Sequence, residues 1–203
     1  MKKILLVTVV FLTISSVNTF GQDEYSFDKG ITVVNGGYGF PNLWKSIFKL
    51  TDAFSTGSKT TGWGPVTIGF EYGVNEKWGL GLQAGKSTVK STFDDGSGYK
   101  SEKTLNNLSI LARVNYHFAN SAKFDPFLGG GIGYNNFKFT FKDNDSDPSN
   151  DGSVSLPIPI AITGAIGARY YFSSNVGLYG EVGYVAGAIF QAGVVLKFGG
   201  AAY

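Results

Sequence analysis

The sequence has no cysteine among its 203 residues. Disulfide bonds, thiolate metal sites and the cysteine-linked anchor of bacterial lipoproteins are therefore excluded. The chain also lacks an excess of charge of either sign. Lys2 and Lys3 account for two of the 17 basic residues, so residues 22–203 carry 15 basic and 15 acidic side chains. This balance gives no reason to expect nucleic acid or an anionic surface as a partner.

Long apolar runs are also missing. A helix needs ~20 apolar residues to cross a bilayer, and the run at residues 4–14 (ILLVTVVFLTI) has only eleven. It follows two lysines and precedes a short polar stretch in which Thr19 and Gly21 suit a cleavage site. We therefore predict a secretory signal peptide over residues 1–21, cleaved after Gly21, and a single domain over residues 22–203. The alternative, a membrane anchor, is disfavoured by the length of the run.

Glycine and aromatic residues are abundant instead. The chain has 29 Gly, 17 Phe and 11 Tyr. Glycine is a poor helix former, and aromatic residues favour strands. The composition therefore indicates either a soluble all-β protein or a protein that crosses a membrane with strands.

Apolar and polar residues alternate along most of the chain after residue 28. In residues 106–118 (NNLSILARVNYHF), Ile110 and Val114 share one face, and Arg113 and His117 share the other. A period of two residues is typical of a β-strand. Eight segments show it: residues 29–40, 64–74, 78–88, 106–118, 125–141, 158–172, 176–184 and 189–198.

The connections between these segments alternate in length. Long connections lie at residues 41–63, 89–103 and 142–157, and short ones at 75–77, 119–124 and 173–175; the short connection at 185–188 breaks the rule. Strands of ~10 residues joined in this way are typical of outer-membrane barrels. We therefore predict an all-β fold, an eight-stranded antiparallel up-and-down transmembrane β-barrel with its apolar faces toward lipid. A soluble lipocalin-like barrel is the alternative, and it would need the opposite orientation of the faces.

Aromatic residues near the strand ends are expected to form two girdles at the membrane surfaces. The girdle on the long-loop side would consist of Phe40, Phe137, Phe139, Phe141 and Tyr184. The alternation slips near Asn135 and Asn136, where we expect a β-bulge.

The stretch FGQDE after the apolar run, the glycine-rich FLGGGIGYNNF and the closing FQAGVVLKF resemble the small outer-membrane β-barrel proteins often labelled "porin family", which include OmpW-like and OmpA-like barrels. Gln22 directly after the cut is similar to export signals of Bacteroidetes. The resemblance implies a Gram-negative outer-membrane protein. Its partners would be outer-membrane lipid, lipopolysaccharide and the barrel-insertion machinery, which would recognise Phe198 or Tyr203.

Charged residues on the inward faces predict the state of the lumen. An eight-stranded barrel is just wide enough for side chains to fill it, and buried charges must pair. We therefore expect a lumen charge network that plugs the barrel, formed by Glu71, Arg113, Arg169, Glu181 and Lys197. The alternative is a gated narrow pore.

Catalytic and metal sites are not expected. His117 is the single histidine, and no serine lies at a partnering distance along its strand. Asp143, Asp145 and Asp147 have the spacing of a calcium loop, but Pro148 stands where that loop requires glycine. We predict a solvated acidic loop there, with weak divalent-ion bridging to lipopolysaccharide as the alternative. No enzyme activity and no cofactor are predicted.

The first long connection has the pattern of a short amphipathic helix. Leu43, Trp44, Ile47 and Phe48 recur at helical spacing. The helix would serve as a lid on the barrel rim or as a contact for a partner.

Pro157 and Pro159 open the sixth segment, and proline cannot donate to a strand ladder. We expect a lateral opening there, through which small hydrophobic solutes pass, as the OmpW-like resemblance implies. The expected function is structural or passive transport. The alternative is a surface adhesin or an interaction subunit of a larger outer-membrane assembly, in contact with other outer-membrane proteins.

Overall fold

The structure is a computed structural model that describes residues 25–199, apart from residues 95, 97, 120 and 145–150. The expected signal peptide, its cleavage site and Tyr203 lie outside the described residues. The elements are β1 (Thr32–Phe40), α2 (Leu43–Asp52), β2 (Ser58–Gly73), β3 (Trp78–Asp94), β4 (Lys100–His117), β5 (Phe124–Asp143), β6 (Gly152–Tyr171), β7 (Val176–Val185) and β8 (Ala188–Phe198). Among the described helices, none is long and apolar enough to cross a membrane.

The eight strands close into one barrel. Each strand pairs antiparallel with the next, and β1 pairs with β8. Apolar side chains point outward, as Ile110 shows with 48% of its surface exposed, and polar ones point inward, as Arg113 shows with 7%. The predicted fold class is therefore confirmed.

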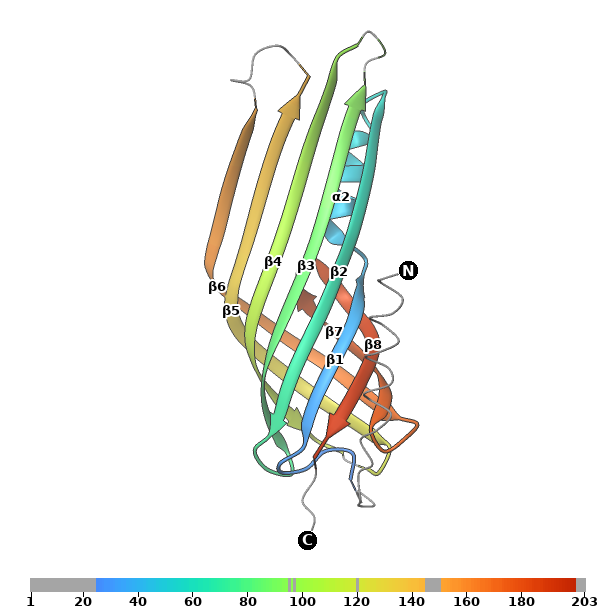
Figure 1. Ribbon diagram of the computed structural model, residues 1–203, viewed down its shortest axis with the longest axis vertical. Helices are drawn as coiled ribbons and strands as arrows, with labels where there is room; N and C mark the ends of the chain where they lie inside the picture. Colours follow the sequence, from blue (N-terminus) through green and yellow to red (C-terminus); the bar gives the residue numbers. More distant parts are fainter. Residues whose placement is uncertain (1–24, 95, 97, 120, 145–150, 200–203) are drawn as a thin grey trace, which may run out of the picture.

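Five strands continue far beyond the closed barrel. Pairing of β1 with β2 ends at Tyr38 and Val66, and pairing of β6 with β7 ends at Ala165 and Gly183. Above this level β2 to β6 form an open sheet, which we call the extension: residues 58–63, 86–94, 100–108, 135–143 and 152–158. Figure 1 shows these strands rising past the short β1, β7 and β8.

Because of the extension, the loops between β2 and β6 are shorter than predicted. Much of the chain at residues 58–63, 89–94, 100–103 and 152–157 was expected to be loop and is strand. These segments were misjudged because most of their outward side chains are polar, so no continuous apolar stripe marks them.

The two faces of the sheet exchange their chemistry where the extension begins. In β3 the outward face carries Leu82 in the barrel and Lys90 in the extension. The inward face carries Gln83 in the barrel and then Val89, which is fully buried. An outward face suits lipid where it is apolar and water where it is polar. The exchange therefore marks the level at which the outward face changes from apolar to polar.

Phe137, Phe139 and Phe141 do not form the expected girdle. They lie on the inward face of the extension, and the first two pair in register with Asn107 and Leu105 of β4. The slip at residues 135–136 is thus the exchange of faces and not an extra residue in β5. Pairing between β5 and β6 is irregular at this level, but the additional residue lies in β6, between Ile158 and Ala161.

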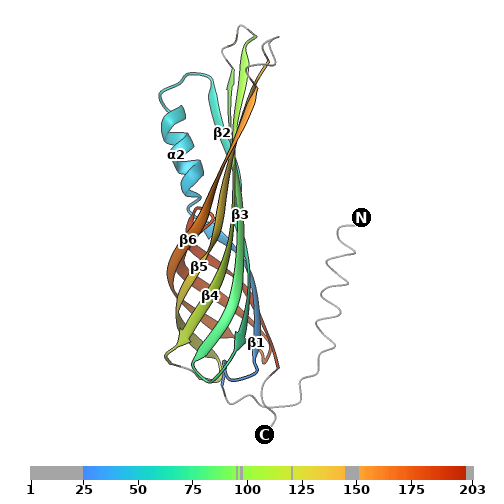
Figure 2. The same ribbon diagram turned by 90° about the vertical axis from the view of Figure 1, so that its left-hand side faces the viewer.

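The helix α2 covers part of the inward face of the extension. Asn42 caps it by accepting a hydrogen bond from the backbone of Lys45. At its other end, the carboxylate of Asp52 accepts hydrogen bonds from Thr60 of β2 and Ser91 of β3. Figure 2 shows α2 on one face of the sheet. The predicted helix is therefore present and lies over β2 and β3.

Candidate functional site

A buried ion cluster fills the barrel near the short turns. The guanidinium of Arg169 pairs with Glu71 and lies 3.0 Å from a carboxylate oxygen of Asp125. His117 lies between the same carboxylates, with Nε2 2.8 Å from Glu71 and Nδ1 2.5 Å from Asp125. All four side chains are buried. Both imidazole nitrogens are thus in contact with carboxylates, and the whole cluster is buried.

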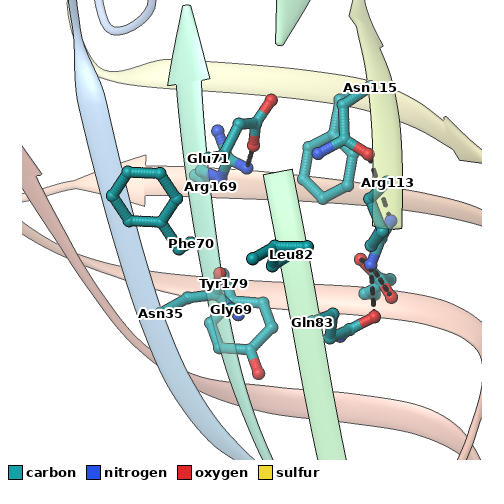
Figure 3. Close-up of a pocket in the computed structure, with 12 residues that line it drawn as sticks. Asn35, Gly69, Phe70, Glu71, Leu82, Gln83, Arg113, Asn115, Arg169 and Tyr179 are labelled. Carbon is teal, nitrogen blue, oxygen red and sulfur yellow. Dashed lines mark hydrogen bonds and ion pairs between the residues drawn. The ribbon is translucent and has the colours of Figure 1, made fainter. Parts of the chain in front are cut away.

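A second cluster lies one layer further into the barrel. Nη1 of Arg113 lies 2.9 and 2.8 Å from the two carboxylate oxygens of Glu181 and donates to Gln83 at 2.8 Å. Nη2 donates to Asn115, and Gln191 donates to Glu181. Figure 3 shows Arg113, Gln83 and Asn115 meeting in the lumen, with Glu71 and Arg169 beside them.

These clusters leave little free space between them. The cavity that they line has a volume of about 20 Å³, close to the room that one water molecule needs. Four of the five residues predicted for the network lie in the two clusters. The described contacts of Lys197 are instead with the carbonyl oxygen of Tyr25, at 3.3 Å, and with the ring of Tyr171.

His117 and Asp125 belong to the ion cluster but were not predicted to do so. Alternation places both on inward faces, so their position was readable from the sequence. Their pairing was not, because it depends on the register between β4 and β5, in which His117 lies opposite Phe127.

The N-terminal segment closes the barrel at the short-turn end. Ser26 and Phe27 are fully buried. The ring of Phe27 stacks on the imidazole of His117, with centroids 3.5 Å apart and planes 7° apart. The backbone N–H of Ser26 donates to the carbonyl of Ser121. Residues 25–31 therefore act as a cork below the charge clusters.

The tip of the β7–β8 hairpin closes the other end of the lumen. Val185 and Ala186 pack against Leu111 of β4. The hydroxyl of Ser87 on β3 donates to the carbonyl of Ala186 at 2.7 Å. The carbonyl of Gly187, which has a φ of 92°, accepts from the backbone of Leu43. The tip thus spans the barrel and holds the start of α2.

An apolar pocket lies beside this tip, where β6 has no β7 alongside it. Its volume is about 370 Å³. The apolar and aromatic side chains around it are those of Trp44, Leu111, Phe137, Ile158, Ala161, Ile162 and Tyr184. Ser109, Asn135 and Thr163 complete the lining, so no charged side chain faces the pocket.

The predicted lateral opening falls on the same strand. Pro157 pairs with Asn136 of β5, and Pro159 lies in the irregular part of β6. Both precede Ala165, the first residue of β6 that pairs with β7. The structure therefore places the two prolines on a stretch whose second edge has no strand partner among the described residues.

Three of the four predicted helix residues line one of two hollows. Trp44 lines the apolar pocket and packs edge-on against Phe137, with centroids 4.9 Å apart. Ile47 and Phe48 line a second hollow of about 330 Å³, together with Lys103 of β4 and several hydroxyl side chains. Leu43 makes the backbone contact with Gly187 described above.

The acidic loop is only partly visible. Asp145 and Asp147 lie outside the described residues, and Asp143 ends β5. Within the part of the chain that the structure describes, no group of three or more His, Asp or Glu side chains is placed to hold a metal ion.

Comparisons with known proteins agree with this architecture. Ail, the attachment invasion locus protein of Yersinia pestis, solved with the heparin analogue sucrose octasulfate, matches with a TM-score of 0.51 and 12% identity, over 84% of this chain and 99% of that one. OprG from Pseudomonas aeruginosa matches with a TM-score of 0.48 and 17% identity, over 88% and 99%. No curated protein sequence matches. The model of the family described as outer membrane protein beta-barrel domain matches residues 7–198.

The chain belongs to this outer-membrane β-barrel family. The match covers every described strand, so the expected family resemblance is confirmed. The exposed apolar belt is therefore the surface that membrane lipid covers, and the extension is the part that leaves the membrane. At the identities found, the structural likeness to Ail concerns the fold alone.

Proposed function

We propose that this protein is a non-enzymatic outer-membrane barrel that does not conduct through its lumen and lets small apolar solutes pass sideways. The solutes would move between the external medium and the bilayer. The observation that carries the proposal is the contrast between the two cavities. The cavity between the charge clusters of the lumen measures about 20 Å³, whereas the pocket beside the unpaired part of β6 measures about 370 Å³.

The orientation follows from the sheet. Short turns face the periplasm in such barrels and the longer parts face outward, so the extension is external in this proposal. Residues 1–21 are the export signal, and Phe198 is the closing aromatic that the insertion machinery recognises. Lys86 and Lys138 lie exposed on the outward face at the foot of the extension, which supports contact with lipopolysaccharide phosphates.

Two measurements test the proposal. The purified protein in a planar bilayer should give no stable single-channel steps, because paired charges fill the lumen. Cells that express it should take up a small apolar fluorophore such as N-phenylnaphthylamine faster than cells without it.

Pocket variants separate lateral passage from general leakiness. Ala161→Phe fills the pocket, and Pro159→Val restores a backbone donor beside it, so both should slow the uptake. Ile160→Phe is the matched control, because Ile160 is 63% exposed on the outer surface. Equal uptake in all these variants would contradict the proposed lateral passage.

A second candidate function is binding of another protein. Val154 and Leu156 on β6 are 59% and 52% exposed, yet they lie on the inward face of the extension, opposite Phe139 and Phe137. An exposed apolar surface outside the membrane favours an adhesin or an interaction subunit. A photo-crosslinking residue at position 154 should then capture a partner, whereas one at Ser153, on the outward face, should not.

A further inference from the structure

The second hollow lies between α2 and the sheet of the extension. Its volume is about 330 Å³, and its lining comes from α2, the turn after it, and the strands β2, β3 and β4. Figure 2 shows α2 beside these strands, above the closed barrel. The hollow therefore belongs to the part of the protein that leaves the membrane, and a ligand reaches it from water.

The carboxylate of Asp52 uses only one of its oxygens within the protein. Oδ2 accepts hydrogen bonds from the hydroxyls of Thr60 and Ser91. Oδ1 has no hydrogen-bond partner among the described residues, and it is not buried. Asp52 is also the last residue of α2, and the C-terminal end of a helix carries partial negative charge. This side of the hollow therefore suits a positively charged donor.

Lys103 places a positive charge on the same hollow. It is exposed, and it forms no ion pair with the carboxylates that the structure describes. In the sheet register it lies opposite Ser91, whose hydroxyl donates to Asp52 at 2.7 Å. Residues directly opposite each other in an antiparallel pair have Cβ atoms about 4.5–5.5 Å apart. The two opposite charges thus flank one site without pairing with each other.

The rest of the lining supplies apolar surface and unused hydroxyl groups. Ile47 and Phe48 of α2 and Phe93 of β3 provide the apolar part. The side chains of Ser58 and Ser101 also line the hollow and form no hydrogen bond with described residues. Both hydroxyls are therefore available to donate to an anionic group.

We infer that this hollow binds a free α-amino acid with an apolar or aromatic side chain. The ammonium group of the ligand donates to Oδ1 of Asp52, and its carboxylate accepts from Lys103. The side chain of the ligand packs against Phe48 and Phe93. A ligand with only one of the two charges leaves either Asp52 or Lys103 without a counter-charge, so the zwitterion is the preferred form.

The size of the hollow agrees with a small ligand. Ligand sites usually measure about 300–1,000 Å³ and combine apolar walls with a few polar groups, and this hollow lies at the lower end of that range. The inference is independent of the proposed lateral passage, because the hollow and the apolar pocket share no lining residue.

The test compares three ligands that share a phenyl ring and a chain: L-phenylalanine, 3-phenylpropanoate, which lacks the ammonium group, and 2-phenylethylamine, which lacks the carboxylate. Binding to the full chain in lipid nanodiscs is measured at pH 7 by saturation-transfer NMR, with empty nanodiscs as the blank. We expect saturable binding of L-phenylalanine, about tenfold tighter than that of either analogue, because each analogue loses one hydrogen bond between charged groups. Equal affinity for the three ligands, or no saturable binding of L-phenylalanine, would overturn the inference.

Two variants assign the charges to their partners. Lys103→Gln should weaken L-phenylalanine and 3-phenylpropanoate about tenfold and leave 2-phenylethylamine unchanged. Asp52→Asn keeps an oxygen that accepts from Thr60 and Ser91, and it should weaken L-phenylalanine and 2-phenylethylamine but not 3-phenylpropanoate. General damage to the hollow would weaken all three ligands together, so the crossed pattern is specific to the two charges.

Lys59→Gln is the matched control. Lys59 is exposed and does not line the hollow, so its variant removes the same charge from the extension and should bind all three ligands as the wild type does. If Lys103→Gln weakens the three ligands equally, or if Lys59→Gln has the same effect as Lys103→Gln, the inference is overturned.

Discussion

Arg113 on β4 and Glu181 on β7 meet inside the closed barrel, with one guanidinium nitrogen 2.9 and 2.8 Å from the two carboxylate oxygens. The residues are 68 positions apart in the chain, and both are buried. Their pair therefore joins distant walls of the barrel and holds the middle of the plug.

Removal of one partner should destabilise the barrel more than removal of both. Arg113→Leu leaves a buried carboxylate without its counter-ion, which we expect to lower the free energy of unfolding by about 3–5 kcal/mol. Arg113→Leu/Glu181→Leu removes both charges and should recover most of that loss. Urea unfolding in lipid vesicles, followed by the shift in electrophoretic mobility, measures both. A double variant no more stable than the single one would contradict the pairing.

The N-terminal cork should contribute to stability without controlling conductance. Phe27 is fully buried against His117, so Phe27→Ala should lower the free energy of unfolding by about 3 kcal/mol. Conductance should stay absent, because the ion clusters above the cork remain in place. Tyr25→Ala is the matched control, since Tyr25 is 46% exposed. A stable open channel in Phe27→Ala would show that the cork is the principal barrier.

The exchange of faces predicts which positions meet water. The chain has no cysteine, so single-cysteine variants give an unambiguous signal. A membrane-impermeant maleimide added to intact cells should label Thr104→Cys and Thr92→Cys on the outward face of the extension. It should not label Leu82→Cys or Ile110→Cys on the same face of the barrel, because lipid covers them. Protection at position 104 would mean that the membrane reaches further up the sheet.

Alternation in the sequence determines which side chains share a face, but it does not reveal what lies on each side. The odd-numbered residues of β5 remain inward from Phe127 to Phe141, and only their surroundings change. A rule that assigns every apolar face to lipid therefore misplaces Phe137, Phe139 and Phe141. The closed barrel was predictable because its strands obey that rule. The extension was not, because it obeys the opposite one.

In the candidate sites, too, some features follow from alternation in the sequence and others do not. The inward position of Arg113, Glu181, Glu71 and Arg169 follows from alternation alone. The contacts of Lys197 with Tyr25 and Tyr171 depend on the path of the N-terminal segment, which has no period to read. The apolar pocket was equally hidden, because it forms where β7 ends before β6, and strand length is set by pairing partners.

The last prediction concerns the free edge of β6. Residues 152–164 pair with β5 but not with β7, and a free edge invites pairing with another chain. Pro157 and Pro159 have no N–H to donate, so they protect this edge. Pro157→Thr/Pro159→Val should therefore increase the fraction of oligomers seen by crosslinking in detergent. Ser155→Val is the control, because it makes the same edge more apolar but adds no donor. If both proteins stay monomeric, the edge is protected by something other than its prolines; if both associate equally, apolar contact and not strand pairing drives the assembly.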